Sequence, residues 1–214
     1  MKDHKLIIEN IIKQVISEMA YPTSFNMEEF KQLKSFAQRV KYCDQRLEKL
    51  GSGSSRIGYK IDDEKVLKLA KNAKGVAQNE AESNSYLQRE YTIVAKVFDS
   101  DPNDLYIEME LVEKLTKSKF KQIVGFDFDS IWPYLESRFG GRNSQRYTGA
   151  DKEILDENEW MYELGDMVGS YDFSYGDFRR LSSFGIVNRD GQPQVVLIDF
   201  GLTNDVFDQF YKKK

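Results

Sequence analysis

A short apolar run that ends in an acidic residue and a Phe-Gly pair is the feature that most restricts what this chain can fold into. Residues 195–198 read Val-Val-Leu-Ile, four apolar residues of the kind that fill a buried strand. Asp199 follows at the end of this strand, and Phe200-Gly201 would turn the chain away from the sheet. Carboxylate oxygens are the ligands that Mg²⁺ prefers, and Mg²⁺ in proteins is often shared with nucleotide phosphates. Asp199 is therefore a candidate Mg²⁺ ligand at the end of a buried strand, and the residues upstream must supply the rest of a phosphate site.

The composition narrows the chemistry that the other residues can supply. The chain has 214 residues, enough for one mid-sized domain or two small lobes, and its 31 basic and 35 acidic residues nearly balance, so we expect no DNA partner. Cys43 is the only cysteine and His4 the only histidine, which argues against disulfides, zinc sites and histidine-dependent catalysis. Because no apolar run approaches the roughly 20 residues of a spanning helix and no signal-peptide cleavage site is evident, we expect a cytoplasmic protein without a membrane partner.

Two amphipathic helices are predicted before the first strand. Apolar residues recur at helical spacing over 6–19, and a second helix is predicted to begin after the N-cap Asn26, with Glu29 completing a capping box. The apolar stripe of this second helix extends to Val40. Both helices are expected to pack against a sheet, because the mixed charge of the first helix disfavours the alternative of a membrane-surface helix. Residues 1–48 are thus predicted to form an N-terminal helical extension.

The middle of the chain is predicted to form an antiparallel sheet of five strands. A glycine-rich first strand begins at Leu50, and a hairpin follows around the turn 62–64. The pattern then predicts a helix between two pairs of strands, followed by a mainly helical region that contains one further hairpin. The expected strands are 56–61, 65–70, 95–99, 105–112, 185–187 and 195–198, and the expected helices are 79–96, 120–139 and 154–168.

The glycine-rich segment and the lysine that follows it suit phosphate binding. Gly51, Ser52, Gly53 and Ser54 open the hairpin, and glycines there let backbone N–H groups approach phosphate oxygens. A flexible connector is the alternative for this segment. Lys68 lies between apolar neighbours on the second hairpin strand, where an ammonium group is costly to bury without an anionic partner. A phosphate would be such a partner, and an outward-facing lysine is the alternative.

Two acidic residues on the predicted helix after the hairpin are candidates to orient Lys68. Glu80 and Glu82 both lie on this helix. We prefer Glu82, because Tyr86 lies four residues later and is expected to anchor the same face of the helix by an apolar contact. The sequence leaves the choice between the two carboxylates open.

The glycine-rich segment, Lys68, the carboxylate on the following helix and Asp199 come in this order along the chain. Residues from Leu50 to Thr203 thereby resemble the protein-kinase-like superfamily. The resemblance implies that Gly51 to Ser54 form the glycine-rich loop over the phosphates. It also implies that Lys68 grips the α- and β-phosphates of ATP and that Glu82 is its helical partner.

The same resemblance implies roles for three further parts of the chain. Met109, Glu110 and Leu111 are similar to the hinge whose backbone binds adenine. Asp199 would hold Mg²⁺ between the phosphates, and Asp177 would act as the base or orienter for the attacking hydroxyl. ATP and Mg²⁺ are therefore the expected cofactors.

The chain also departs from the kinase pattern. Arg56 stands where the third loop glycine is usual, and Gly58 replaces an apolar residue that covers adenine. The tripeptide before and including Asp177 is Tyr-Gly-Asp, closer to the His-Gly-Asp of small-molecule kinases than to His-Arg-Asp. Ser182 occupies the position of the asparagine that binds a second metal, followed by Ser183, and a hydroxyl is a poorer Mg²⁺ ligand than an amide.

The expected structure is an α+β, two-lobed protein-kinase-like fold. It has an antiparallel five-stranded small lobe over residues 49–113 and a helical lobe over 114–214, shortened because only thirteen residues follow Gly201. The resemblance implies an ATP- and Mg²⁺-dependent phosphotransferase whose acceptor is a protein Ser or Thr. The alternatives are a catalytically inactive pseudokinase that binds a protein partner, and a small-molecule kinase. The compactness resembles kinase-like proteins of bacteria and phage, which implies the bacterial or host cytoplasm.

Overall fold

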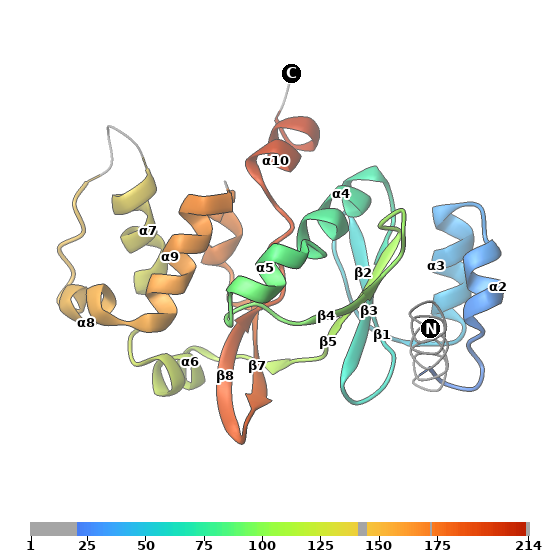
Figure 1. Ribbon diagram of the computed structural model, residues 1–214, viewed down its shortest axis with the longest axis horizontal. Coiled ribbons are helices and arrows are strands. Elements are labelled where there is room, and N and C mark those ends of the chain that lie inside the picture. The colour runs from blue at the N-terminus through green and yellow to red at the C-terminus, as the bar shows by residue number, and fades with distance from the viewer. Residues whose placement is uncertain (1–20, 141–144, 172, 213–214) are drawn as a thin grey trace, which may run out of the picture.

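The protein is an α+β structure built around an antiparallel sheet of five strands (Figure 1). The computed structural model describes residues 21–140, 145–171 and 173–212. The helix predicted over 6–19 and part of the polar connection after Phe139 lie outside these residues. None of the helices in the described residues has the length and apolar character needed to span a lipid bilayer.

The five-stranded sheet has the order β1-β2-β3-β5-β4, and every neighbouring pair is antiparallel. Its strands are β1 (Glu48–Ser52), β2 (Arg56–Lys60), β3 (Lys65–Ala70), β4 (Val97–Ser100) and β5 (Tyr106–Glu110). The predicted hairpin is confirmed, with Gly58 of β2 opposite Lys68 of β3. β1 begins two residues before Leu50 and includes the first half of the glycine-rich segment.

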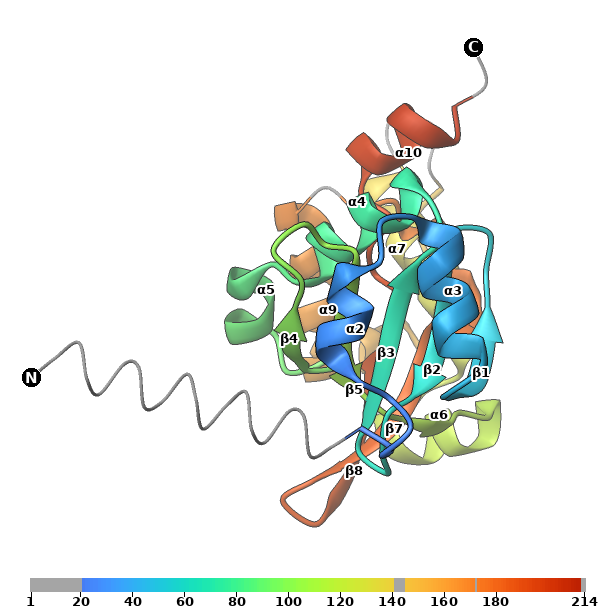
Figure 2. The same cartoon turned by 90° about the vertical axis from the view of Figure 1, so that its right-hand side faces the viewer.

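Two short helices, α2 (Met27–Gln32) and α3 (Phe36–Asp44), cover one face of this sheet (Figure 2). The predicted N-cap is confirmed, because Asn26 Oδ1 accepts a hydrogen bond from the N–H of Glu29 at 3.0 Å, but the Glu29 side chain accepts from the hydroxyl of Tyr42 at 3.1 Å instead of completing a capping box. The prediction of a single helix up to Val40 is wrong. The backbone leaves the helical conformation at Leu33, and Ser35 caps a new helix in a capping box. The residues buried between these helices and the sheet include Tyr21, Phe25, Phe30, Tyr42, Ile57, Tyr59, Leu67 and Tyr106.

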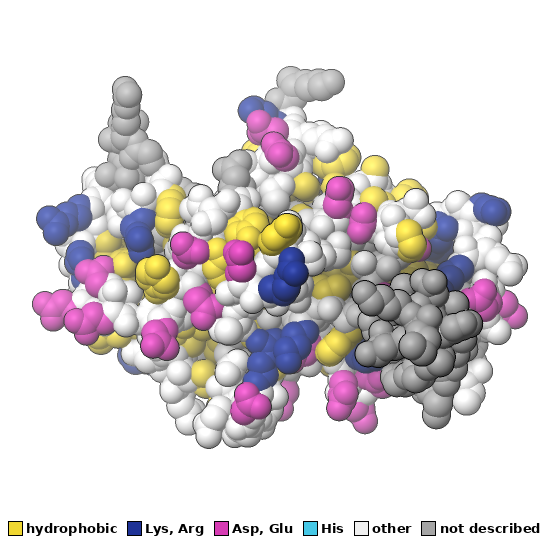
Figure 3. Space-filling view, in the orientation of Figure 1, with side chains coloured by type: hydrophobic (Ala, Val, Ile, Leu, Met, Phe, Trp, Pro, Cys, Tyr) yellow, Lys and Arg dark blue, Asp and Glu magenta, His cyan; other side chains and the backbone are white. Residues whose placement is uncertain are grey.

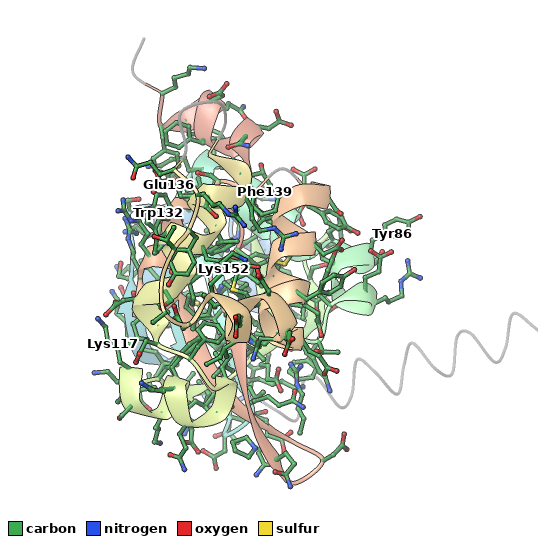
Figure 4. All side chains as sticks on the ribbon, turned by 90° about the vertical axis from the view of Figure 1, so that its left-hand side faces the viewer. Tyr86, Lys117, Trp132, Glu136, Phe139 and Lys152 are labelled. Atoms are coloured by element: carbon green, nitrogen blue, oxygen red, sulfur yellow. The ribbon has the colours of Figure 1, made fainter. Side chains whose placement is uncertain are left out.

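The helix predicted over 79–96 is also two helices, α4 (Ala73–Glu82) and α5 (Ser85–Glu90). Asn84 separates them, since its side chain accepts a hydrogen bond from the N–H of Tyr86 at 2.9 Å and caps α5. Tyr86 is 62% exposed and points away from the body of the protein in Figure 4, so it does not anchor the face that carries Glu82. The reason for preferring Glu82 was therefore wrong.

Most of the remaining helices lie to one side of a second, three-stranded sheet with the order β6-β7-β8, whereas the C-terminal helix packs on α4 (Figure 1). The elements are β6 (Glu113–Lys114), α6 (Lys117–Val124), η1 (Phe128–Ser130), α7 (Ile131–Phe139), α8 (Lys152–Glu157), α9 (Glu159–Tyr171), η2 (Tyr175–Arg179), η3 (Leu181–Ser183), β7 (Phe184–Arg189), β8 (Gln192–Leu197) and α10 (Asn204–Phe210). The single helix expected over 120–139 is interrupted because Gly125, with φ of +99°, ends α6 in the left-handed region. The helix expected over 154–168 is divided at Asn158.

The end of β8 is hydrogen-bonded to the chain that leads into β4, which joins the two sheets. The N–H of Leu197 donates to the C=O of Ile93 at 2.7 Å, and the N–H of Ala95 donates to the C=O of Leu197 at 2.8 Å. The strands predicted over 185–187 and 195–198 are both present: β7 extends beyond the first at both ends, and β8 begins three residues before the second and ends at Leu197. This junction places Asp199, two residues beyond Leu197, next to the five-stranded sheet.

Candidate functional site

A cleft of about 1210 Å³ is formed by the five-stranded sheet together with residues 174–202 and α10. It contains eleven of the residues singled out from the sequence, namely Gly51, Ser52, Gly53, Ser54, Lys68, Met109, Glu110, Leu111, Asp177, Ser182 and Asp199. Glu82 does not line the cleft, because its side chain is fully buried behind Lys68. The structure therefore brings the predicted site residues together from segments far apart in the sequence.

Lys68 forms the central ion pair of the cleft. Its Nζ lies 2.8 Å from Oε2 of Glu82, the last residue of α4, and also donates to the C=O of Ile198. The sequence left open whether Glu80 or Glu82 pairs with Lys68. Glu80 is exposed on the same helix, and Glu82 is the carboxylate that binds Lys68. Burial lowers the pKa of Lys68, and the charge of Glu82 opposes this shift without cancelling it.

The second oxygen of Glu82 holds the turn that follows Asp199. Oε1 accepts hydrogen bonds from the N–H of Phe200 at 3.1 Å and from the N–H of Gly201 at 3.0 Å. A side chain at Gly201 would not fit, since a Cβ there would lie 2.5 Å from the C=O of Gln78 in α4. Burial alone would raise the pKa of Glu82, but its cationic neighbours outweigh burial and lower it.

Arg56 is a site residue that the sequence reasoning missed. Its Nη2 lies 2.7 Å from Oε1 of Glu82 and 2.6 Å from Oδ1 of Asp199, while Nη1 donates to Asn79 Oδ1 at 3.3 Å. Burial alone would lower the pKa of Arg56, but the two carboxylates outweigh burial and raise it. One signal was present in the sequence. Arg56 lies two residues before Gly58, which is opposite Lys68, so strand alternation puts both cations on one face.

Asp177 lies on η2, near Asp199. The two segments are tied together by the N–H of Ser174, which donates to the C=O of Leu202 at 2.9 Å. η2 is also held by Arg179, whose guanidinium lies 3.9 Å from the ring centre of Trp132, labelled in Figure 4. Burial, and after it the negative charge of Asp199, raises the pKa of Asp177 above its ordinary value. Asp177 therefore holds a proton to a higher pH than an exposed aspartate.

The two serines after Asp177 have different surroundings. Ser183 is buried, and its hydroxyl donates to the C=O of Asp177 at 2.9 Å. Ser182 is exposed and lines the cleft. Of the two hydroxyls, the one of Ser182 is therefore accessible from the cleft.

The donor set fits a Mg²⁺ ion that arrives with a polyphosphate better than a free ion. In residues 21–140, 145–171 and 173–212 there is no group of three or more His, Cys, Asp or Glu side chains that could hold a metal. Asp199 is 43% exposed and has one oxygen on Arg56. Mg²⁺ is usually bound through one or two carboxylates, with phosphates and waters completing its shell. Asp199 and Ser182 are the residues that would contact such an ion.

Two backbone N–H groups of the segment expected to bind adenine already donate hydrogen bonds within the protein. Met109, Glu110 and Leu111 line the cleft, and Met109 is fully buried. The N–H of Glu110 donates to the C=O of Lys96 at 2.8 Å, and the N–H of Leu111 donates to the C=O of Glu64 at 2.7 Å. In this arrangement neither N–H is available to a base, so an adenine would have to use other groups of the segment.

The glycine-rich segment is exposed at the mouth of the cleft. All five residues of β1 are exposed, and a Cβ added to Gly51 would have no neighbour within 4 Å. Lys71 restrains the segment, since its Nζ donates a hydrogen bond to the C=O of Gly53 at 2.7 Å. Packing does not require glycine at position 51, which leaves room for the close approach of a ligand.

No protein-family model matches the chain, and no curated protein matches it in sequence. The face drawn in Figure 3 has basic and acidic side chains interspersed over the described surface, without the broad basic area that nucleic-acid binding needs. What the cleft binds must be inferred from its own residues.

Proposed function

We propose that this protein is an ATP- and Mg²⁺-dependent phosphotransferase with a two-lobed, protein-kinase-like fold. One observation carries the proposal. Glu82 joins Lys68 at 2.8 Å to the N–H groups of Phe200 and Gly201, and this turn follows Asp199 directly. The buried carboxylate of Glu82 thus holds both the ammonium of Lys68 and the turn next to Asp199 at the same cleft. Phosphoryl transfer requires a positioned cation and a positioned metal ligand of this kind.

Each residue of the cleft would have a separate role in phosphoryl transfer. Lys68 would contact the α- and β-phosphates, and Glu82 keeps its ammonium in one position. Asp199 would hold Mg²⁺, whose positive charge would offset the negative charge of the phosphates. Asp177 would accept the proton of the acceptor hydroxyl while the bond from the γ-phosphorus to the ADP oxygen breaks and a bond to the acceptor oxygen forms.

The environment of Asp177 supports its role as the base. A carboxylate with a raised pKa is a stronger base than an exposed one, and proton transfer is most efficient when the pKa lies nearer the working pH. The acceptor proposed is the hydroxyl of a protein Ser or Thr, or of a small molecule.

A pseudokinase is the second candidate, and a specific contact favours it. Arg56 already neutralises Asp199 at 2.6 Å, which opposes the binding of a metal ion. In that case the fold would present a surface to a protein partner, and the cleft would serve structure or ligand binding without transfer.

Thermal unfolding with ATP and Mg²⁺ tests the binding step. Ligand at about 100 times its dissociation constant adds roughly 2.7 kcal/mol of stability, or about 5–10 °C for a chain of this size. We expect this shift in the wild type and its loss in Lys68→Met. Lys65→Met is the matched control, because Lys65 lies on the same strand and alternation directs it to the opposite face.

Phosphate release from ATP separates the two candidates. If the protein is a phosphotransferase, Asp177→Asn should keep the ATP-induced shift and lose turnover. A wild type that binds ATP but releases no phosphate, with any acceptor tried, would favour the pseudokinase. No thermal shift at millimolar ATP would refute the phosphotransferase and favour the pseudokinase, whose cleft need not bind a nucleotide.

A further inference from the structure

We propose that Arg56 is a built-in counter-cation for Asp199, so that the cleft takes ATP as the metal-free anion nearly as well as with Mg²⁺. This inference rests on the proposed function, because it concerns how the same cleft receives the nucleotide. ATP sites usually depend on a divalent cation, and Arg56 would reduce that dependence in this cleft.

The contact between Arg56 and Asp199 is direct and links distant parts of the chain. Nη2 of Arg56 lies 2.6 Å from Oδ1 of Asp199, and the two residues are 143 positions apart. The guanidinium is held from behind by Glu82 at 2.7 Å and by Asn79 at 3.3 Å. The Arg56 side chain is only 9% exposed, so it is fixed at the cleft rather than extended into solvent.

The carboxylates of Glu82 and Asp199 would both keep hydrogen-bond partners or solvent if Arg56 were absent. Glu82 retains Lys68 and two backbone N–H groups without it. Asp199 is 43% exposed, so water can solvate its carboxylate. The pairing of Arg56 with Asp199 therefore changes the charge of the cleft more than it relieves a burial cost.

The charge of this cluster shows the consequence. Two cations, Arg56 and Lys68, balance two anions, Glu82 and Asp199, so the four groups sum to zero. Without Arg56 the other three would sum to −1. A metal-free triphosphate thus meets a neutral cluster and an oriented ammonium group, whereas a cluster of charge −1 would repel it unless a divalent cation came with it.

The same contact disfavours a divalent cation on its own. An ion at Asp199 would lie close to the guanidinium, and like charges at such a distance repel strongly where water is partly excluded. The described residues contain no group of three or more His, Cys, Asp or Glu side chains that could hold the ion, and the nearby carboxylate of Asp177 is itself paired with Arg180 at 3.3 Å. Free Mg²⁺ or Mn²⁺ should therefore bind weakly until Arg56 is removed.

The experiment compares the affinity for ATP in excess Mg²⁺ and in EDTA by isothermal titration calorimetry. For the wild type we expect the two dissociation constants to agree within about threefold. For Arg56→Gln we expect ATP to bind at least about tenfold more weakly in EDTA than in Mg²⁺. Arg89→Gln is the matched control, because it removes the same charge from the exposed face of α5, and its ratio should equal that of the wild type.

A second measurement uses the metal alone. Binding of Mn²⁺, followed by electron paramagnetic resonance, should be at least about fivefold tighter in Arg56→Gln than in the wild type or in Arg89→Gln. Equal Mn²⁺ affinities would overturn the role of Arg56 as a counter-cation, whether or not ATP binds.

The outcomes separate this inference from the proposed function. A wild type that binds ATP about tenfold more tightly with Mg²⁺ overturns the inference and leaves the proposed function standing. This result needs no variant, so it decides the matter even if Arg56→Gln fails to fold. No binding of ATP in either condition overturns the proposed function and the nucleotide part of the inference together.

Discussion

Replacing Glu82 by glutamine should strongly destabilise the protein, because this carboxylate neutralises two cations that are almost entirely buried. Lys68 is 14% exposed and Arg56 is 9% exposed, while Glu82 itself is fully buried. Glutamine keeps an oxygen for the backbone N–H groups of the turn at Phe200 and removes the negative charge. The ammonium of Lys68 would then face an amide, and the more distant, partly exposed Asp199 would be the negative charge left to act on it.

The magnitude follows from the burial of the pair. Removing one partner of a buried ion pair costs about 3–5 kcal/mol, since the remaining charge stays desolvated. For a chain of this length, each kcal/mol corresponds to about 2–4 °C, so the melting temperature of Glu82→Gln should fall by roughly 6–20 °C. Glu80→Gln makes the same change at an exposed position of α4 and should stay within about 0.5 kcal/mol of the wild type.

Urea and thermal unfolding, followed by circular dichroism, measure this difference, and its dependence on pH provides a further check. The folded pKa of Glu82 is lowered, so its contribution is fully present above the unfolded value near 4.5 and is lost as pH falls through the folded pKa. The gap between the wild type and Glu82→Gln should therefore narrow as the pH is lowered below 4.5. If Glu82→Gln and Glu80→Gln were equally stable at neutral pH, the reasoning would be refuted.

Two further predictions concern the turn at Gly201 and the carboxyl group of Asp177. Gly201→Ala should cost about 1–3 kcal/mol in urea unfolding, because its Cβ would meet the backbone of α4, whereas Gly51→Ala meets nothing within 4 Å and should be nearly neutral. Equal losses in the two variants would contradict the close approach of α4 to the turn. By ¹³C NMR, the carboxyl of Asp177 should titrate above the ordinary value of 3.8, and Asp199→Asn should lower its pKa by removing a like charge. An unchanged pKa in that variant would show that the two carboxylates do not interact.

The parts of the structure that were predicted correctly depend on neighbours in the sequence. The hairpin of β2 and β3 follows from apolar residues and a turn, and the cap at Asn26 joins residues three positions apart. The strand that carries Asp199 to the cleft was likewise evident from four apolar residues. Where the prediction failed, as for the helix over 79–96, a polar side chain such as that of Asn84 competed with helical hydrogen bonding, which periodicity alone does not weigh.

The sequence by itself identified Lys68 and Asp199 from local strand patterns, and Asp177 from the resemblance of its tripeptide to a kinase motif. Only the tertiary structure decided how they are paired. The choice of Glu82 over Glu80 depends on how α4 packs against β3, and the contact of Arg56 with Asp199 spans 143 positions. Ion pairs of this kind depend on distances of a few ångströms and on burial, and both are set by packing between elements whose order along the chain does not specify their separation.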